Sequence, residues 1–211
     1  MADMQQISAL LQAGRVADLV GRVEAALAEG VEAEHLLTQG LIAGMNVVGE
    51  KFRVSELFVP DVIFAGRAMT AAMKVLQPHL TAKGVPSAGR VVLGTVKGDL
   101  HDIGKNLVGM LLEGAGFTVI NLGTDVSPEK FVEAARGHAP CLVGMSALLT
   151  TTMPVMAKVV EQLRAARLPG VRTMVGGAPL TQKFADEIGA DGYAPDAGSA
   201  ADLARRLAAA G

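Results

Sequence analysis

The chain contains few of the residues that stabilise disulfide-bonded or aromatic-rich proteins. Its 211 residues include one cysteine, no tryptophan, one tyrosine and six phenylalanines. The single Cys141 excludes an internal disulfide, and the apolar residues around it predict that it lies in the core. Because aromatic residues are scarce while half of the chain is apolar, the core has to be built from Ala, Val, Leu, Ile and the ten methionines.

The sequence also lacks an excess of one charge and a long apolar run. The formal net charge is −2 and both signs are mixed throughout, whereas nucleic-acid-binding proteins normally carry a basic stripe. No uninterrupted apolar run approaches the roughly 20 residues that span a bilayer. Residues 1–6 lack the basic start and apolar core of a signal peptide. We therefore expect a cytoplasmic protein that binds neither nucleic acid nor membrane.

The N-terminal part of the chain has the apolar spacing of helices. Apolar residues recur every three or four positions, and Gly14 and Gly30 fall where helices are expected to end. A third helix is expected around residues 36–48. A fourth follows Pro60, which suits a first helical turn, and is expected to end at Pro78. Four helices joined by short loops predict a four-helix bundle.

A change of pattern separates this bundle from the rest of the chain. The segment 81–89 has the glycine, proline and small polar residues of a linker, so we place one domain at 1–88 and another at 89–211. Short apolar runs then alternate with amphipathic segments. Strands are expected at 90–96, 117–121, 141–145, 171–175 and 191–194, and helices at 104–115, 128–138, 153–167, 181–188 and 199–209. Five strand–helix units predict an α/β domain with a parallel sheet covered on both faces.

The polar segment after the first strand carries the strongest chemical signal. Residues 99–104 read Asp-Leu-His-Asp-Ile-Gly, at the strand end where open α/β sheets bind ligands. His101 has one carboxylate two residues before it and another directly after it. This arrangement suits a histidine that binds a metal through one ring nitrogen while an acid holds the other. By itself the segment fits a metallohydrolase site equally, or a histidine with a purely structural role.

Two further elements follow at defined distances. After Gly104 come 41 residues, then Ser146-Ala-Leu148, then 27 residues and Gly176-Gly177, and each element follows an apolar strand-like run. Asp-x-His-x-x-Gly, Ser-x-Leu and Gly-Gly at these separations resemble the signature of the cobalamin-binding module of methionine synthase and of the corrinoid methyl-carrier proteins. The resemblance covers almost the whole chain. It implies a flavodoxin-like (Rossmann-like) sheet of order 2-1-3-4-5 with the ligand at the carboxyl ends of the strands.

The resemblance implies roles for the motif residues. In this family a histidine replaces the displaced lower base of cobalamin as the axial ligand of cobalt, which implies that His101 is the metal ligand. Asp99 is then the acid on the other imidazole nitrogen, and Thr152 is the hydroxyl that extends this relay, where the family has serine. The other implied cofactor-binding residues of this domain are Gly98, Asp102, Ile103, Gly104, Ser146, Leu148, Thr150, Gly176, Gly177 and Ala197.

Several of these residues match parts of the cofactor. Ser146 and Thr150 match positions that hydrogen-bond the displaced base and its tail, and Leu148 packs in the same slot. The glycines permit close approach of the backbone to the nucleotide tail. Ala197 is expected in the loop after the last strand, beside the corrin or its tail. Lys105 and Asn106 either contact phosphate or propionamide groups of the ligand or are solvated.

The helical part matches the cap that covers the upper face of the corrin in this family. Phe52, Val59 and Val62 match apolar cap contacts, although the same residues also suit the core of a bundle. Because a cap has to open for methyl transfer, we expect hinge motion about 81–89.

The resemblance implies a methyl-carrying corrinoid protein. Such a protein accepts a methyl group on cobalt(I) from a substrate-specific methyltransferase and presents methylcobalamin to a second methyltransferase, with tetrahydrofolate or a thiol as the acceptor. A reductive activation protein is a further implied partner. Because 211 residues leave no room for a catalytic barrel of about 250 residues, we expect a non-catalytic corrinoid subunit of a methyltransferase system.

Two other classes of cobalamin protein are alternatives. The small subunit of an adenosylcobalamin mutase resembles residues 90–211 but normally lacks the helical cap. A cobalamin-dependent sensor keeps both parts, but it usually adds a DNA-binding domain and a tryptophan-rich cap. This chain has neither a basic patch nor a tryptophan. The methyl donor is not identified by the sequence, since its recognition resides in the partner.

Overall fold

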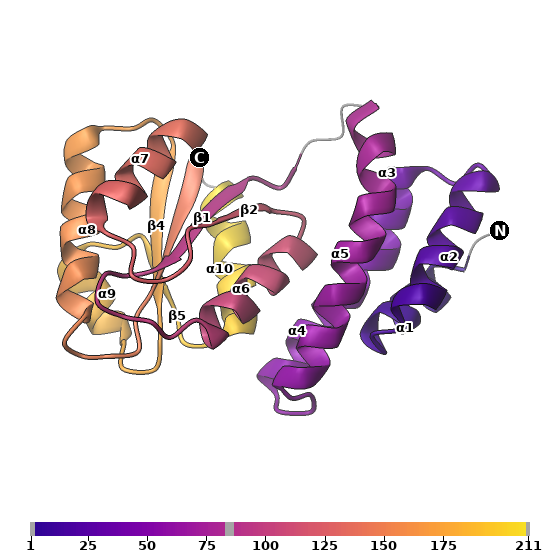
Figure 1. The fold of residues 1–211 in the computed structure, drawn as a ribbon, viewed down its shortest axis with the longest axis horizontal. Coiled ribbons are helices and arrows are strands. Elements are labelled where there is room, and N and C mark those ends of the chain that lie inside the picture. Colours follow the sequence, from indigo (N-terminus) through magenta and orange to yellow (C-terminus); the bar gives the residue numbers. More distant parts are fainter. Residues whose placement is uncertain (1–2, 83–86, 210–211) are drawn as a thin grey trace. The chain divides into compact units, whose positions relative to one another are not determined.

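The structure, a computed structural model, describes residues 3–82 and 87–209. It divides into two compact units, Met1–Pro86 with Glu113–Gly116, and Ser87–Leu112 with Phe117–Gly211 (Figure 1). The expected hinge at 81–89 includes residues 83–86, which lie outside the described residues. None of the helices that the structure describes is both long enough and apolar enough to cross a membrane.

The first unit is helical, as the sequence predicts. It contains α1 (Met4–Gln12), α2 (Val16–Ala28), α5 (Val59–Ala82) and a continuous helical run of α3 (Ala33–His35), the π-helical η1 (Leu36–Ile42) and α4 (Ala43–Arg53). Helix α2 packs against α5, and α1 packs against η1 and α4. The core consists of fully buried aliphatic side chains, which include Ile7, Leu11, Leu19, Leu36, Leu41 and Leu76.

Two helices of this unit differ from the expectation. The third expected helix is longer and contains a π-helical segment. The fourth does not end at Pro78 but continues to Ala82. A proline inside a helix removes one hydrogen bond and costs about 3 kcal/mol. Leu80 lies beyond the proline and is buried, and burial of a leucine side chain stabilises by about 2 kcal/mol. This burial offsets much of the cost of the extra turn.

The second unit is built on a five-stranded sheet. Its strands are β1 (Arg90–Thr95), β2 (Thr118–Asn121), β3 (Cys141–Ser146), β4 (Val171–Gly176) and β5 (Gly192–Ala194), all parallel and in the order β2-β1-β3-β4-β5. This order confirms the flavodoxin-like prediction. Thr95 pairs with Ser146, Ser146 with Gly176, and Gly176 with Ala194. The carboxyl ends of four strands therefore lie in one row.

Helices cover both faces of the sheet. Helices α7 (Pro128–His138), α8 (Met153–Ala166) and α9 (Gln182–Ile188) lie on one face, and α6 (Ile103–Gly114) and α10 (Ala197–Ala209) lie on the other (Figure 1). Cys141 belongs to the core beneath α7 and α8, as the sequence predicts, and burial raises the pKa of its thiol. The buried polar residues Thr95, Asp99 and Thr152 lie at or after the carboxyl ends of β1 and β3.

Candidate functional site

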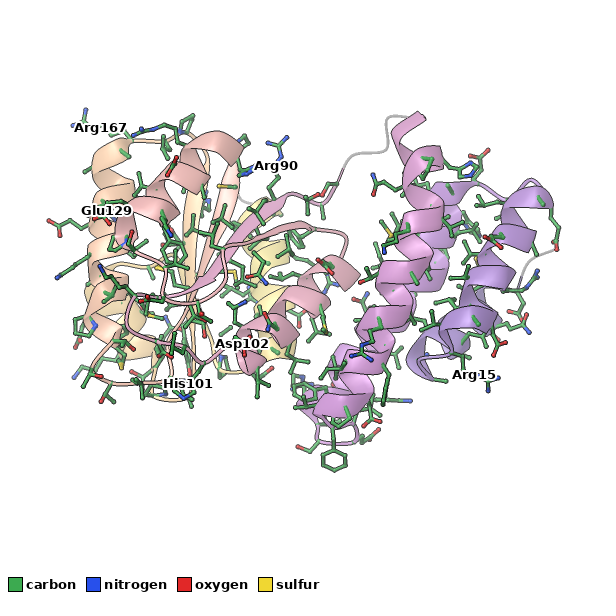
Figure 2. All side chains as sticks on the ribbon, in the orientation of Figure 1. Arg15, Arg90, His101, Asp102, Glu129 and Arg167 are labelled. Atoms are coloured by element: carbon green, nitrogen blue, oxygen red, sulfur yellow. The ribbon has the colours of Figure 1, made fainter. Side chains whose placement is uncertain are left out.

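His101 lies on the segment between β1 and α6. The structure places it at the edge of the sheet opposite Arg90, the first residue of β1 (Figure 2). Its side chain is 53% exposed, whereas the side chain of Asp99 is fully buried. A histidine at the surface that is bonded to a buried acid has one side held by the protein and the other side open to a ligand.

Asp99 holds both the ring and the main chain of His101 through a single carboxylate oxygen. Oδ1 of Asp99 lies 2.8 Å from Nδ1 of the imidazole and accepts a hydrogen bond from the backbone N–H of His101 at 3.0 Å. With Nδ1 engaged in this way, Nε2 is the ring nitrogen that can bind a metal. The residue pattern alone fits either neighbouring carboxylate, the family resemblance implies Asp99, and the geometry places Asp99 against the ring.

The second carboxylate oxygen of Asp99 is bound from the loop after β3. Oδ2 accepts hydrogen bonds from the backbone N–H groups of Leu148 at 2.7 Å and Leu149 at 3.2 Å, and from the hydroxyl of Thr152 at 3.1 Å. The Asp-x-His-x-x-Gly and Ser-x-Leu elements, which have 41 residues between them in the chain, thus meet at one carboxylate. Both backbone donors were missed by sequence reasoning, because a backbone N–H is present at every residue other than proline.

These contacts decide the charge of Asp99. Burial favours the neutral acid, but the hydrogen bonds from the backbone of His101 and Leu148, the His101 ring and the backbone of Leu149 outweigh it. Together they hold the pKa of Asp99 well below its usual range. The carboxylate is therefore ionised at neutral pH and accepts hydrogen bonds only.

Thr152 contributes its hydroxyl to this network although the residue precedes α8 in the helix-capping position. The side chain makes no capping hydrogen bond. Its Oγ1 lies 3.1 Å from Oδ2 of Asp99 and 2.8 Å from the carbonyl oxygen of Leu149. Since a hydroxyl has one proton, it donates to only one of the two at a time. The methyl group lies near Gly98, 3.4 Å from where a Cβ there would be.

Thr152→Val tests the hydroxyl at constant shape. We expect the free energy of unfolding, measured with urea at neutral pH, to fall by about 1–2 kcal/mol, because a hydrogen bond to a charged acceptor is lost. Thr152→Ser is the matched control. It keeps the hydroxyl and loses only the methyl group, so a smaller effect is expected. Equal losses in the two variants would show that packing, and not the hydroxyl, is what the site needs.

The surface around His101 is largely apolar, although the neighbouring Asp102 is also exposed. Leu100 is 73% exposed and Ile103 is 71% exposed, and Leu148 and Leu149 are also exposed large hydrophobic residues. The contacts of Asp99 bring the two leucines after β3 to the same place as His101. Within residues 3–82 and 87–209, no three His, Cys, Asp or Glu residues are grouped to hold a metal ion. His101 is thus a single histidine on a largely apolar surface.

The four glycines of the motifs differ in what a side chain would meet at their positions and in their backbone conformation. At Gly177, with φ +138°, a Cβ would lie 1.9 Å from the carbonyl oxygen of Ala147. Gly98 has φ +86°, a left-handed conformation. A Cβ at Gly176 would lie 3.1 Å from the carbonyl oxygen of Ala194, and a Cβ at Gly104 would meet nothing within 4 Å. Only Gly104 therefore leaves open space beside the site.

Asp102 and Lys105 belong to a second polar network. The carboxylate of Asp102 accepts a hydrogen bond from Nδ2 of Asn106 at 3.0 Å. Lys105 is buried, and its ammonium donates to the side-chain oxygens of Asn106 at 2.5 Å and Asn121 at 2.8 Å. Burial lowers the pKa of Lys105, and the charge of Asp102 opposes the shift. The expectation that Lys105 is solvated is wrong, since it is buried and ties α6 to the end of β2.

The structure places the remaining predicted residues as follows. Ser146 ends β3 and is half-buried, while Thr150 is exposed in the following loop. Ala197 does not lie in a loop but begins α10 and is buried. In the helical unit, Phe52 and Val59 are half-buried, and Val62 is fully buried in the core.

Comparison with known proteins identifies the family. Residues 89–202 and residues 4–77 each match a B12 binding domain. The chain is 45% identical to trimethylamine corrinoid protein 1 of Methanosarcina mazei, over 88% of this chain and 86% of that protein. A crystal structure of a cobalamin-binding protein from Desulfitobacterium hafniense has a TM-score of 0.82 at 30% identity, covering 98% of this chain and 99% of the other. A chain of the methanol:cobalamin methyltransferase complex from Methanosarcina barkeri has a TM-score of 0.84 at 28% identity, covering 97% of this chain and 79% of the other. The chain therefore belongs to the cobalamin-binding corrinoid proteins.

Proposed function

We propose that this protein carries a methyl group on the cobalt of a bound corrinoid, with His101 as the lower axial ligand. The observation that carries the proposal is the exposed imidazole whose Nδ1 is held by the buried carboxylate of Asp99. A single histidine on a largely apolar surface suits a metal that arrives with its other ligands already in a macrocycle. The exposed side chains of Leu100, Ile103 and Leu148 suit the face of such a ring.

The residues of the site suit three tasks. Asp99 orients the imidazole and, through its charge, strengthens Nε2 as a donor. Thr152 completes a His-Asp-hydroxyl relay, in which the hydroxyl proton is placed against either Asp99 or Leu149. The open space at Gly104 admits a ligand close to the start of α6. A bound corrinoid supplies a reduced cobalt that takes a methyl group from one partner and yields it to another.

Other parts of the site are proposed by resemblance. Ser146 and Thr150 bind the displaced base and its tail, together with Leu148. Residues 1–88 form the cap domain and 89–211 the cofactor domain. Phe52 and Val59 are only half-buried, which supports a role at the upper face of the corrin, whereas the full burial of Val62 favours a core role.

The partners follow from the proposed chemistry. A substrate-specific methyltransferase supplies the methyl group, and a second methyltransferase passes it to tetrahydrofolate or to a thiol. A reductive activation protein restores cobalt(I), and the system works in the cytoplasm. Similarity to a trimethylamine corrinoid protein and to a methanol:cobalamin methyltransferase complex supports a methyltransferase partner.

His101→Ala tests the proposed axial ligand. The protein is loaded anaerobically with cobalamin and reduced to the cobalt(II) state, and its electron paramagnetic resonance spectrum is recorded. Protein labelled with nitrogen-15 is used, and wild type is expected to show splitting from one axial nitrogen-15 nucleus of His101. This splitting differs from the nitrogen-14 splitting that the cofactor's own lower base would give. The variant is expected to lose the nitrogen-15 splitting and to bind the corrinoid at least tenfold more weakly.

His138→Ala is the matched control for this substitution. His138 ends α7 just before β3 begins, at the opposite edge of the sheet. We expect this variant to keep the wild-type spectrum and affinity. A wild-type protein that retains no corrinoid, or a His101→Ala spectrum identical to that of wild type, would overturn the proposal.

The acceptor is tested separately with the methylated protein. Tetrahydrofolate or a thiol coenzyme is added in the presence of the partner methyltransferase, and the loss of the methyl group is followed in the ultraviolet–visible spectrum. The proposal requires rapid loss with one of the two acceptors. Loss with neither would contradict the carrier role.

A further inference from the structure

The loop between β2 and α7 contacts the segment that carries His101, although no sequence motif pointed to it. Val126 forms a parallel bridge with Val96, and its N–H donates to the carbonyl of Thr95 at 3.0 Å. The loop therefore continues the sheet beyond the end of β1. Asp125 is the residue of this loop that reaches the Asp-x-His motif.

Asp125 binds the main chain of the motif at two points. Its carboxylate oxygen Oδ1 accepts a hydrogen bond from the N–H of Gly98 at 2.8 Å. Its own N–H donates to the carbonyl oxygen of Asp99 at 3.0 Å. The two bonds hold both ends of the Gly98–Asp99 dipeptide, so they determine where the side chain of Asp99 begins.

The backbone of Asp125 is held in an uncommon conformation. Its φ is +54°, and among the described residues only Ser55 and Arg167 share a positive φ without being glycine. A left-handed conformation is unfavourable for an L-residue, and a short polar side chain that bonds locally lowers the cost. In this conformation the carboxylate and the N–H of the same residue both face the motif.

Asp99 has to be placed accurately because its two carboxylate oxygens contact five hydrogen-bond donors. Oδ1 serves the backbone and the ring of His101, and Oδ2 serves Leu148, Leu149 and Thr152. The carbonyl of His101 is held independently by the hydroxyl of the buried Thr95 at 3.0 Å. A shift of the Gly98–Asp99 dipeptide would move the carboxylate while the main chain of His101 stays anchored.

We propose that Asp125 is a positioning residue for the axial ligand. It holds the Gly98–Asp99 dipeptide so that Asp99 keeps the imidazole of His101 in its metal-binding orientation. This inference rests on the proposed function, in which His101 binds cobalt. The role belongs to the side-chain oxygen of Asp125 and not to its charge, because the bond that it accepts comes from a neutral N–H.

Two substitutions separate the oxygen from the backbone conformation. Asp125→Asn keeps a side-chain oxygen and tolerates a positive φ. Asp125→Gly allows the same φ and keeps the N–H that binds Asp99, but it removes the acceptor of the Gly98 N–H. Because Asp125 is exposed, neither change opens a cavity. Arg167→Gly is the control for relief of left-handed strain, since Arg167 has φ +48° and lies at the opposite edge of the unit (Figure 2).

Each variant is loaded with cobalamin, and the cobalt(II) electron paramagnetic resonance spectrum and the corrinoid Kd are measured. Asp125→Asn and Arg167→Gly are expected to keep the axial nitrogen splitting and a Kd within about twofold of wild type. Asp125→Gly is expected to show a mixture of histidine-bound and histidine-free spectra and a Kd raised about tenfold. If Asp125→Gly does not fold by circular dichroism, Asp125→Ala is tested with the same expectation.

The outcomes distinguish this inference from the proposed function. Wild-type spectra and affinity in both variants that lack the acceptor would overturn the positioning role while leaving His101 as the ligand. Equal spectral loss in Asp125→Asn and Asp125→Gly would overturn the role of the oxygen. A wild-type protein without axial nitrogen splitting would overturn the proposed function, and the positioning role with it.

Discussion

Replacing Asp99 by asparagine is expected to lower the free energy of unfolding of the cofactor-free protein by about 3 kcal/mol at neutral pH. Asp99 is fully buried and accepts hydrogen bonds on both oxygens. An asparagine of the same shape has one oxygen and one NH₂ group. If the NH₂ faces His101, it meets the backbone N–H of that residue. If it faces the other way, it meets the N–H groups of Leu148 and Leu149. Either orientation sets donor against donor.

The loss of stability in Asp99→Asn is expected to become smaller as the pH falls. In the folded protein the pKa of Asp99 lies below the ordinary value of about 3.9. Its contribution to stability is therefore complete above a pH of about 4. It is lost progressively as the pH falls toward the folded pKa, because the unfolded chain then binds a proton that the folded chain does not. Asp99→Asn has no such titration, so the difference between wild type and variant narrows in acid.

Urea unfolding at pH values of about 7 and 3 measures both effects. Asp102→Asn is the matched control, because it removes a neighbouring carboxylate that is exposed and accepts a side-chain hydrogen bond from Asn106. Its expected effect is below about 1 kcal/mol. Equal losses in the two variants would show that the buried hydrogen bonds of Asp99 do not stabilise the fold. A loss in Asp99→Asn that does not shrink in acid would show that the charge of Asp99 does not contribute to stability.

Local patterns in the sequence predict most of the secondary structure of this protein. Glycine, proline and apolar spacing place the strands and helices of the α/β unit within two residues of their observed bounds. The misjudged elements are those where packing overrides a local signal. Pro78 is a strong helix breaker, but burial of Leu80 extends α5 past it. Ala197 joins α10 because its small side chain is buried there.

Residue types predict only part of the candidate site. His101, Asp99 and Thr152 carry side chains with recognisable chemistry, and the structure brings the three together. The donors that keep Asp99 ionised are mostly backbone N–H groups, which no residue type marks. Asp125 follows the same logic, because its importance comes from a left-handed backbone and from contacts to main-chain atoms.

Gly177→Ala is expected to destabilise the protein by about 3–5 kcal/mol, a large part of the stability of a typical domain. The new Cβ would lie 1.9 Å from the carbonyl oxygen of Ala147, and φ is +138°. Overpacking and a strained backbone each cost about 1–3 kcal/mol. The clashing atom is main chain, so no side-chain rotation relieves the contact, and Ala147 itself has to move.

The displacement is expected to reach His101, the proposed metal ligand. Ala147 donates its N–H to the carbonyl oxygen of Gly176 at 3.3 Å and is followed by Leu148 and Leu149, whose N–H groups hold Asp99. Moving Ala147 therefore withdraws donors from the carboxylate that orients His101. In thermal or urea unfolding the variant should be strongly destabilised. Any folded fraction should bind cobalamin at least tenfold more weakly.

A glycine in a motif can be required by the fold, as at Gly177, or can leave space for a ligand, as proposed at Gly104. Gly104→Ala tests the second case. A Cβ at Gly104 meets no atom within 4 Å, and the residue lies in α6. The cofactor-free variant should therefore be as stable as wild type, or more stable by up to about 1 kcal/mol. Its corrinoid affinity should fall, because the added methyl group enters the space that the ligand is proposed to use. Wild-type stability in Gly177→Ala would contradict the anchoring of Ala147. Wild-type affinity in Gly104→Ala would instead place the corrinoid away from the start of α6, so the two glycines test the protein and its ligand separately.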